Sequence, residues 1–233
     1  MRKRRIAVIS FNASPLKSNL KQSIYVAETA RNLRTHDWEV DVFTRCDSAD
    51  LPEIFDWTEG VRVIHVPAGF AGTVENADLL RLVPQFISSM IRFFKQQRYD
   101  IVHANFFLSG LVALNLKRTT ETPFVVTFHE LGRRSQKEVS EFSDVRFDIE
   151  DRVVREAAAI VAESVEEKTD LMYLYDAMPE KISVISSETL NLQEKTRQLA
   201  ALYETVLAKT KVSLTETARL AMQNLKQSST GRF

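Results

Sequence analysis

Short apolar segments alternate with helical patterns from the start of the chain to about residue 187. Strands that are apolar on both faces and are separated by helices are typical of a parallel sheet covered on both sides. The pattern therefore predicts an α/β fold over residues 1–187, a doubly wound, parallel, Rossmann-like sheet. The seven predicted strands span residues 4–10, 38–45, 61–67, 99–105, 123–129, 159–164 and 181–186.

The alternation ends after the last of these strands, and residues 188–233 predict a C-terminal helical appendage. We expect two helices in it. Residues 192–209 carry one apolar stripe, and residues 213–227 follow a capping-box spacing formed by Ser213 and Glu216. We expect the stripe to pack against the first domain.

Composition restricts the function classes. The 31 basic residues balance 31 acidic ones, which argues against a nucleic-acid-binding surface. The basic start at residues 2–5 is followed by too few apolar residues for a secretory signal, so we expect at most peripheral membrane contact. No segment is long and apolar enough to span a membrane. A single cysteine, Cys46, fits the reducing cytoplasm.

The loop after the first predicted strand contains no glycine between residues 11 and 23. Dinucleotide-binding enzymes place glycines there so that the backbone can approach a phosphate, which argues against a Rossmann dehydrogenase or a methyltransferase. Lys21 and Ser23 could instead bind an anion through their side chains near a helix N-terminus. The alternative is a solvated loop.

Six segments resemble, in this order, the amino-terminal domain of family 4 glycosyltransferases: SIYVAETARNLRTHDWEVDVFTR, GVRVIHVPAG, YDIVHANFFLSG, PFVVTFHELGR, AAAIVAESVEE and PEKISVI. The combination is most similar to the branch that contains sucrose-phosphate synthase and the inositol-phosphate glycosyltransferase of mycothiol synthesis. The resemblance implies a GT-B architecture. In that architecture a first domain holds the acceptor and a second holds the sugar nucleotide.

The sequence departs from the family in two places. After residue 186 the family continues into the donor-binding domain, whereas this chain passes to a segment similar to the family's closing helix. The resemblance thus predicts a single GT-B half whose donor domain is missing, by natural or engineered deletion. The family's glycine pair corresponds to Leu20 and Lys21, which indicates an eroded phosphate site.

Candidate site residues follow from the rule that ligands meet an open α/β sheet at the carboxyl ends of its strands. His129 ends the fifth predicted strand, and the resemblance places a histidine there beside the transferred sugar, so it is our catalytic candidate. For several of the others a structural role is the alternative. The candidates for substrate binding are Lys21, Ser23, His103, Asn105, Arg133, Arg134 and Glu163.

The resemblance implies transfer of a hexose from a nucleotide sugar to an acceptor hydroxyl. The groups that stabilise the departing diphosphate belong mainly to the second domain, so we expect transfer only if a separate donor-binding domain completes the site. The alternatives are a non-catalytic protein that binds a sugar or sugar phosphate, or an inactive truncation. We expect no cofactor and no metal. The expected partners are a donor-domain chain or a second copy of this chain.

Overall fold

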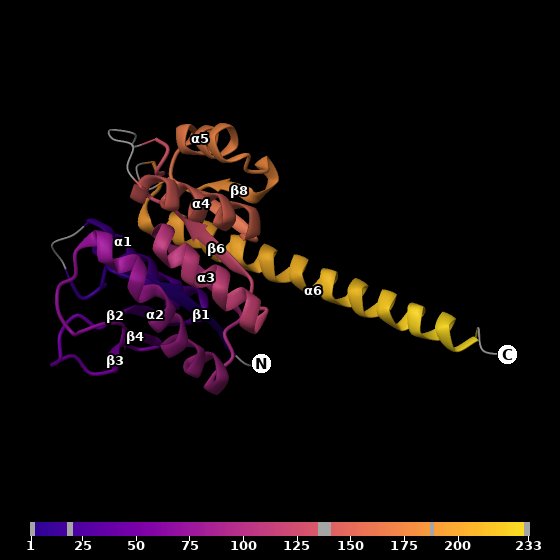
Figure 1. The fold of residues 1–233 in the computed structure, drawn as a ribbon, viewed down its shortest axis with the longest axis horizontal. Coiled ribbons are helices and arrows are strands. Elements are labelled where there is room, and N and C mark those ends of the chain that lie inside the picture. The colour runs from indigo at the N-terminus through magenta and orange to yellow at the C-terminus, as the bar shows by residue number, and fades with distance from the viewer. Residues whose placement is uncertain (1–2, 18–20, 135–140, 187–188, 231–233) are drawn as a thin grey trace.

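The computed structural model describes residues 3–17, 21–134, 141–186 and 189–230. They contain one eight-stranded sheet in the order β3-β4-β2-β1-β5-β6-β7-β8, which confirms the α/β fold (Figure 1). All neighbouring strands are parallel except β3 and β4. The strands are β1 (Arg4–Ile9), β2 (Trp38–Arg45), β3 (Ile54–Thr58), β4 (Val61–Val66), β5 (Ile101–Asn105), β6 (Phe124–Thr127), β7 (Ala159–Ala162) and β8 (Ile182–Val184).

The antiparallel strand β3 is a departure from the predicted all-parallel sheet. It lies at the sheet edge, and its side chains are mostly exposed. A tight turn joins it to β4, and Gly60 in this turn has a φ of 74°, which costs a glycine little. Because neither face of β3 is buried, its residues lack the continuous apolar pattern by which the other strands were predicted.

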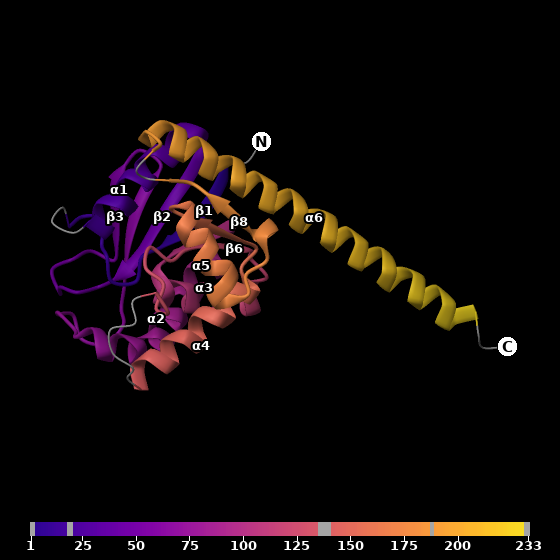
Figure 2. The same ribbon diagram turned by 90° about the horizontal axis from the view of Figure 1, so that it is seen from above.

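Helices cover both faces of the sheet, as in a doubly wound fold. Along β1, Ile6 and Val8 belong to one core cluster, and Ala7 and Ile9 belong to the other. One cluster includes residues of α2, α3, α4 and α5, and the other includes residues of α1 and α6. Figure 2 shows the sheet between these layers. The helices are α1 (Lys21–Leu33), α2 (Asn76–Gln96), α3 (Phe106–Thr120), α4 (Glu141–Glu156), α5 (Val165–Tyr175) and α6 (Leu192–Thr230).

The two expected C-terminal helices are one continuous helix, α6, of 39 residues. Asn191 caps its start, where the side-chain oxygen accepts a hydrogen bond from the Glu194 backbone amide at 2.9 Å. The first part of α6 packs on the sheet, and the later part extends beyond the body of the domain (Figures 1 and 2).

The expected packing of the apolar stripe is confirmed. Leu199 and Tyr203 are fully buried and Val206 nearly so, and Leu202 packs against the same cluster. No helix in the described part of the chain combines the length and apolar character needed to cross a bilayer.

Candidate functional site

The strand order changes direction at β1 and β5, which are neighbours in the sheet although β2, β3 and β4 lie between them along the chain. Such a switch point leaves a crevice at the carboxyl ends of the strands. Two pockets open there, of about 240 Å³ and about 540 Å³, and both are lined in part by Gln22 and Glu130. We call them the phenylalanine pocket, lined by Phe11, Phe106, Phe107 and Phe128, and the histidine pocket, lined by Tyr25, His129, Glu163 and Lys195.

His129 lines the histidine pocket and lies at the centre of a polar cluster. Its Nε2 is 3.1 Å from Asn105 Oδ1, and its Nδ1 is 3.1 Å from Glu163 Oε2. Asn105 ends β5, His129 follows β6 and Glu163 follows β7, so three neighbouring strands bring these side chains together. Both partners present acceptor oxygens, and an imidazole donates from both nitrogens only when it is charged. The cluster can therefore hold a proton at the strand ends.

Aromatic rings surround His129. The Phe106 ring lies 4.5 Å from it at an angle of 36°, and the Tyr25 ring lies 4.5 Å from it at 78°. Burial raises the pKa of the Tyr25 hydroxyl, and the charge of Glu163 acts in the same direction, so Tyr25 keeps its proton.

The backbone at this point is strained. Phe106 has a φ of 69° and His129 a φ of 62°, and a bulky side chain rarely adopts the left-handed region. Helix α3 begins at Phe106 directly after β5, so the chain turns from strand to helix without a loop. Strain of this kind tends to gather at functional sites.

Lys195, from the first turn of α6, is a site residue that the sequence did not indicate. Its side chain is largely buried, and its Nζ lies 3.7 Å from the centre of the Tyr25 ring. Burial lowers its pKa, whereas Glu163 and Glu28 act in the opposite direction. The sequence could have indicated Lys195 by its position on the buried stripe of α6, one turn before Leu199.

His103 lies beneath the site rather than in either pocket lining. It is fully buried, with Nδ1 2.6 Å from the Tyr203 hydroxyl and Nε2 2.9 Å from Thr127 Oγ1. Burial, together with the neighbouring His129 and Lys195, lowers its pKa to about 3. His103 is therefore neutral in the fold and joins α6 to the sheet.

The two predicted anion-binding residues of α1, Lys21 and Ser23, differ in their exposure to solvent. Lys21 is exposed and lines the histidine pocket, whereas Ser23 is fully buried. Within the described ranges, the Ser23 hydroxyl has no hydrogen-bond partner. Gln22, between them, lines both pockets and was not predicted.

Arg133 and Arg134 are engaged with carboxylates outside the two pockets. The Arg133 guanidinium binds Asp151 at 2.5 and 2.7 Å, which raises its pKa, and it lines a further pocket of about 340 Å³. Arg134 lies 3.3 Å from Asp170.

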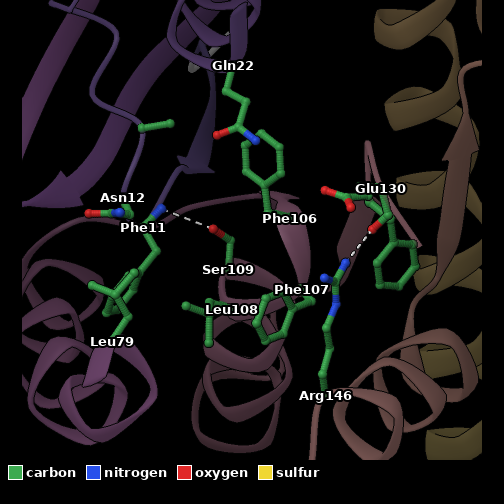
Figure 3. A pocket seen from close by; sticks show the side chains of 12 residues that line it. Phe11, Asn12, Gln22, Leu79, Phe106, Phe107, Leu108, Ser109, Glu130 and Arg146 are labelled. Carbon is green, nitrogen blue, oxygen red and sulfur yellow. Dashed lines mark hydrogen bonds between the residues drawn. The ribbon is translucent and has the colours of Figure 1, made fainter. Parts of the chain in front are cut away.

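The buried carboxylate of Glu150 organises the loop that carries these arginines. It accepts hydrogen bonds from the Gly132 amide at 3.1 Å, from Arg146 Nε at 2.8 Å and from the Tyr175 hydroxyl at 2.5 Å. Arg146 also donates to the Glu130 carbonyl at 2.8 Å (Figure 3). The described residues contain no group of three metal-ligating side chains placed to hold an ion.

A doubly wound sheet with polar side chains gathered beside its switch point defines a Rossmann-like ligand-binding domain. Residues 22–187 match the family model described as "Glycosyl transferase 4-like domain". The chain therefore belongs to this glycosyltransferase family, as the sequence predicted.

The curated relatives include inositol-phosphate glycosyltransferases. The chain is 32% identical over 194 residues to "D-inositol 3-phosphate glycosyltransferase" of Thermobispora bispora, covering 78% of this chain and 45% of that protein. The enzyme of the same name from Corynebacterium glutamicum is 31% identical over 193 residues, covering 78% of this chain and 46% of that protein. The chain spans about half the length of the curated relatives it matches.

Solved structures show the same fold. Sucrose-phosphate synthase of Thermosynechococcus elongatus matches with a TM-score of 0.73 and 24% identity, over 79% of this chain and 48% of that chain. A shorter chain of the same synthase matches with a TM-score of 0.72 and 21% identity, over 87% of this chain and 99% of that chain. The predicted resemblance to the branch that contains these two enzymes is confirmed.

Proposed function

We propose that this chain is the acceptor-side half of a glycosyltransferase. In this proposal it holds an acceptor hydroxyl in the crevice beside His129, and a donor-binding domain closes over it for transfer. The observation that carries the proposal is the cluster of His129, Asn105 and Glu163 at the ends of three neighbouring strands. A hydroxyl group in the histidine pocket would meet His129 and Glu163 in its lining, while the buried Asn105 holds the His129 ring.

His129 is the catalytic candidate in this proposal. A charged imidazole has two N–H donors, so in this proposal His129 donates to a hydroxyl or phosphate oxygen brought over the pocket by exchanging its bond to Asn105 or Glu163 for one to the ligand. Glu163 and Asn105 hold the ring by its two nitrogens, so their role is to position it. Lys195 and Lys21 add positive charge to the same pocket.

The donor side requires more than the described residues supply. Glycosyl transfer from a nucleotide sugar depends on preorganised cations and amides that stabilise the departing diphosphate. It also requires that donor and acceptor are held against each other with water excluded. One open crevice provides neither, so we propose that the 233-residue chain transfers sugar only with a donor-binding domain, on another chain or in a larger assembly.

Binding without transfer is the second candidate function, as a sugar or sugar-phosphate binding protein. The glycine-free segment of residues 11–23 favours it, because a donor phosphate usually approaches a glycine-rich turn at this position. For both functions we propose a cytoplasmic location, because the single cysteine fits a reducing compartment.

Calorimetric titration of the 233-residue chain tests the proposal. The curated relatives are named for D-inositol 3-phosphate, so the titrants include this compound, glucose, glucose 6-phosphate and UDP-glucose. We expect at least one acceptor to bind, His129→Ala to weaken it about tenfold, and a control variant at the distant His36, His36→Ala, to leave it unchanged. UDP-glucose that bound while every acceptor failed would contradict the proposal.

A further inference from the structure

The phenylalanine pocket differs in character from the histidine pocket beside it. It lies directly at the switch point, between residues that follow β1 and the first turn of α3 (Figure 3). Four phenylalanines and two leucines line it, and the neutral amides of Asn12 and Gln22 stand among them. At about 240 Å³ it is smaller than most drug-sized sites, so it fits a single ring with its substituents.

The charges of this pocket do not favour an anion. Of its lining residues, only Arg146 and Glu130 are charged. Arg146 donates to the buried Glu150 carboxylate at 2.8 Å and to the Glu130 carbonyl at 2.8 Å, and its guanidinium lies 4.8 Å from the Phe107 ring. The buried carboxylate of Glu150 balances the charge of Arg146. A phosphate would therefore meet, among the described residues that line this pocket, no cation without a carboxylate partner.

The aromatic wall is held in place before any ligand arrives. The Phe11 amide donates to Ser109 Oγ at 3.0 Å, and the Phe11 ring packs on Phe86 at 4.6 Å. Phe106 is fixed in the left-handed region, with its ring stacked beside His129. A rigid aromatic surface binds the apolar face of a ring with little loss of side-chain entropy.

We propose that the phenylalanine pocket takes an uncharged, ring-shaped acceptor with an apolar or aromatic face, of the aryl glycoside class, and not a phosphorylated polyol. This inference rests on the proposed function and names its acceptor class. The ring stacks among the phenylalanines, and one hydroxyl reaches the edge where Glu130 and Gln22 belong to both pockets. That edge opens toward His129. The acceptor class therefore differs from the phosphorylated polyol for which the curated relatives are named.

Competing titrations of the 233-residue chain test the inference. The probes are 4-nitrophenyl glucoside, methyl glucoside, D-inositol 3-phosphate and inorganic phosphate. We expect 4-nitrophenyl glucoside to bind at least tenfold more tightly than either phosphate compound, with an affinity that does not change with ionic strength.

Two variants locate the binding. Phe106→Gly removes one aromatic wall, and Gln22→Trp fills the pocket from an exposed position without changing the core. Each should weaken 4-nitrophenyl glucoside at least tenfold while far-ultraviolet circular dichroism stays the same. Tyr173→Ala removes a ring that is 79% exposed on α5 and should change nothing.

The outcomes separate this inference from the proposed function. Tighter binding of D-inositol 3-phosphate than of the aryl glycoside would overturn the inference and leave the proposed function standing. Aryl glycoside binding that both variants left intact would also overturn the inference alone. If none of the hydroxyl compounds bound, both would be overturned.

Discussion

The contact between Tyr203 and His103 joins α6 to the sheet. Replacing Tyr203 measures how much this contact contributes to the free energy of unfolding. The Tyr203 side chain is fully buried, and its ring meets Trp38 edge-on at 5.6 Å. Burial raises the pKa of its hydroxyl, so the hydroxyl keeps its proton, and it shares a hydrogen bond of 2.6 Å with His103 Nδ1. Tyr203→Phe keeps the ring and removes only this hydrogen-bond partner.

The expected magnitudes follow from what each variant leaves behind. Tyr203→Phe leaves a buried ring nitrogen without a partner, which should lower the free energy of unfolding by about 1–3 kcal/mol. Tyr203→Ala also removes the packed ring, which costs a further ~3–5 kcal/mol. Because a domain of this kind is typically stable by about 5–15 kcal/mol, the alanine variant should be close to unfolding.

Urea denaturation followed by tryptophan fluorescence is the assay, since Trp38 lies beside Tyr203. The exposed Tyr173→Phe is the matched control and should change the free energy by less than about 0.5 kcal/mol. The double variant of Tyr203→Phe with His103→Leu should cost less than the sum of its parts, because it removes both polar partners. A Tyr203→Phe variant as stable as the control would refute the reasoning.

Three further predictions concern stability. The pKa of His103 is about 3 in the fold against an ordinary 6.5, so between these values the unfolded chain binds more protons and the free energy of unfolding falls as the pH falls. From pH 7 to pH 5 the loss should be about 2 kcal/mol, and a pH series of urea titrations should show it in the wild type but not in His103→Gln. Phe106→Gly should be more stable than Phe106→Ala by about 1–2 kcal/mol in thermal melts, because glycine accepts the positive φ; equal melting temperatures would argue against strain at this position. Glu150→Leu should cost about 3–5 kcal/mol, because it leaves Arg146 without its carboxylate. Glu204→Gln, in an exposed pair with Arg4, is its control and should cost less than about 1 kcal/mol in the same urea assay.

The sequence predicted those parts of the fold that bury apolar residues on both faces. It missed β3, whose exposed side chains give no apolar pattern. The sequence predicted two helices where the structure has α6 alone, because the spacing of Ser213 and Glu216 is that of a helix start. Residues 209–213 contain neither glycine nor proline, however, so nothing in them ends the helix.

For the candidate site, the rule of strand ends selected His129, Asn105 and Glu163 one by one, and in the structure Asn105 and Glu163 both lie 3.1 Å from the His129 ring. It could not show that Lys195 and Tyr203 reach the same region, because along the chain Tyr203 lies 100 positions from His103 and Lys195 lies 170 positions from Tyr25. It also could not separate Arg133, which Asp151 holds, from an arginine that is free to bind a ligand. Such pairing depends on tertiary contacts that no local pattern records.

The most direct test of the central claim is a transfer assay on the purified 233-residue chain. The chain is incubated with a radiolabelled nucleotide sugar and with the acceptor that calorimetry identifies, and the labelled product is counted against a blank without protein. We predict acceptor binding and no transfer above the blank. Multiple turnovers by the chain alone would contradict the claim that these residues form only the acceptor side of the enzyme.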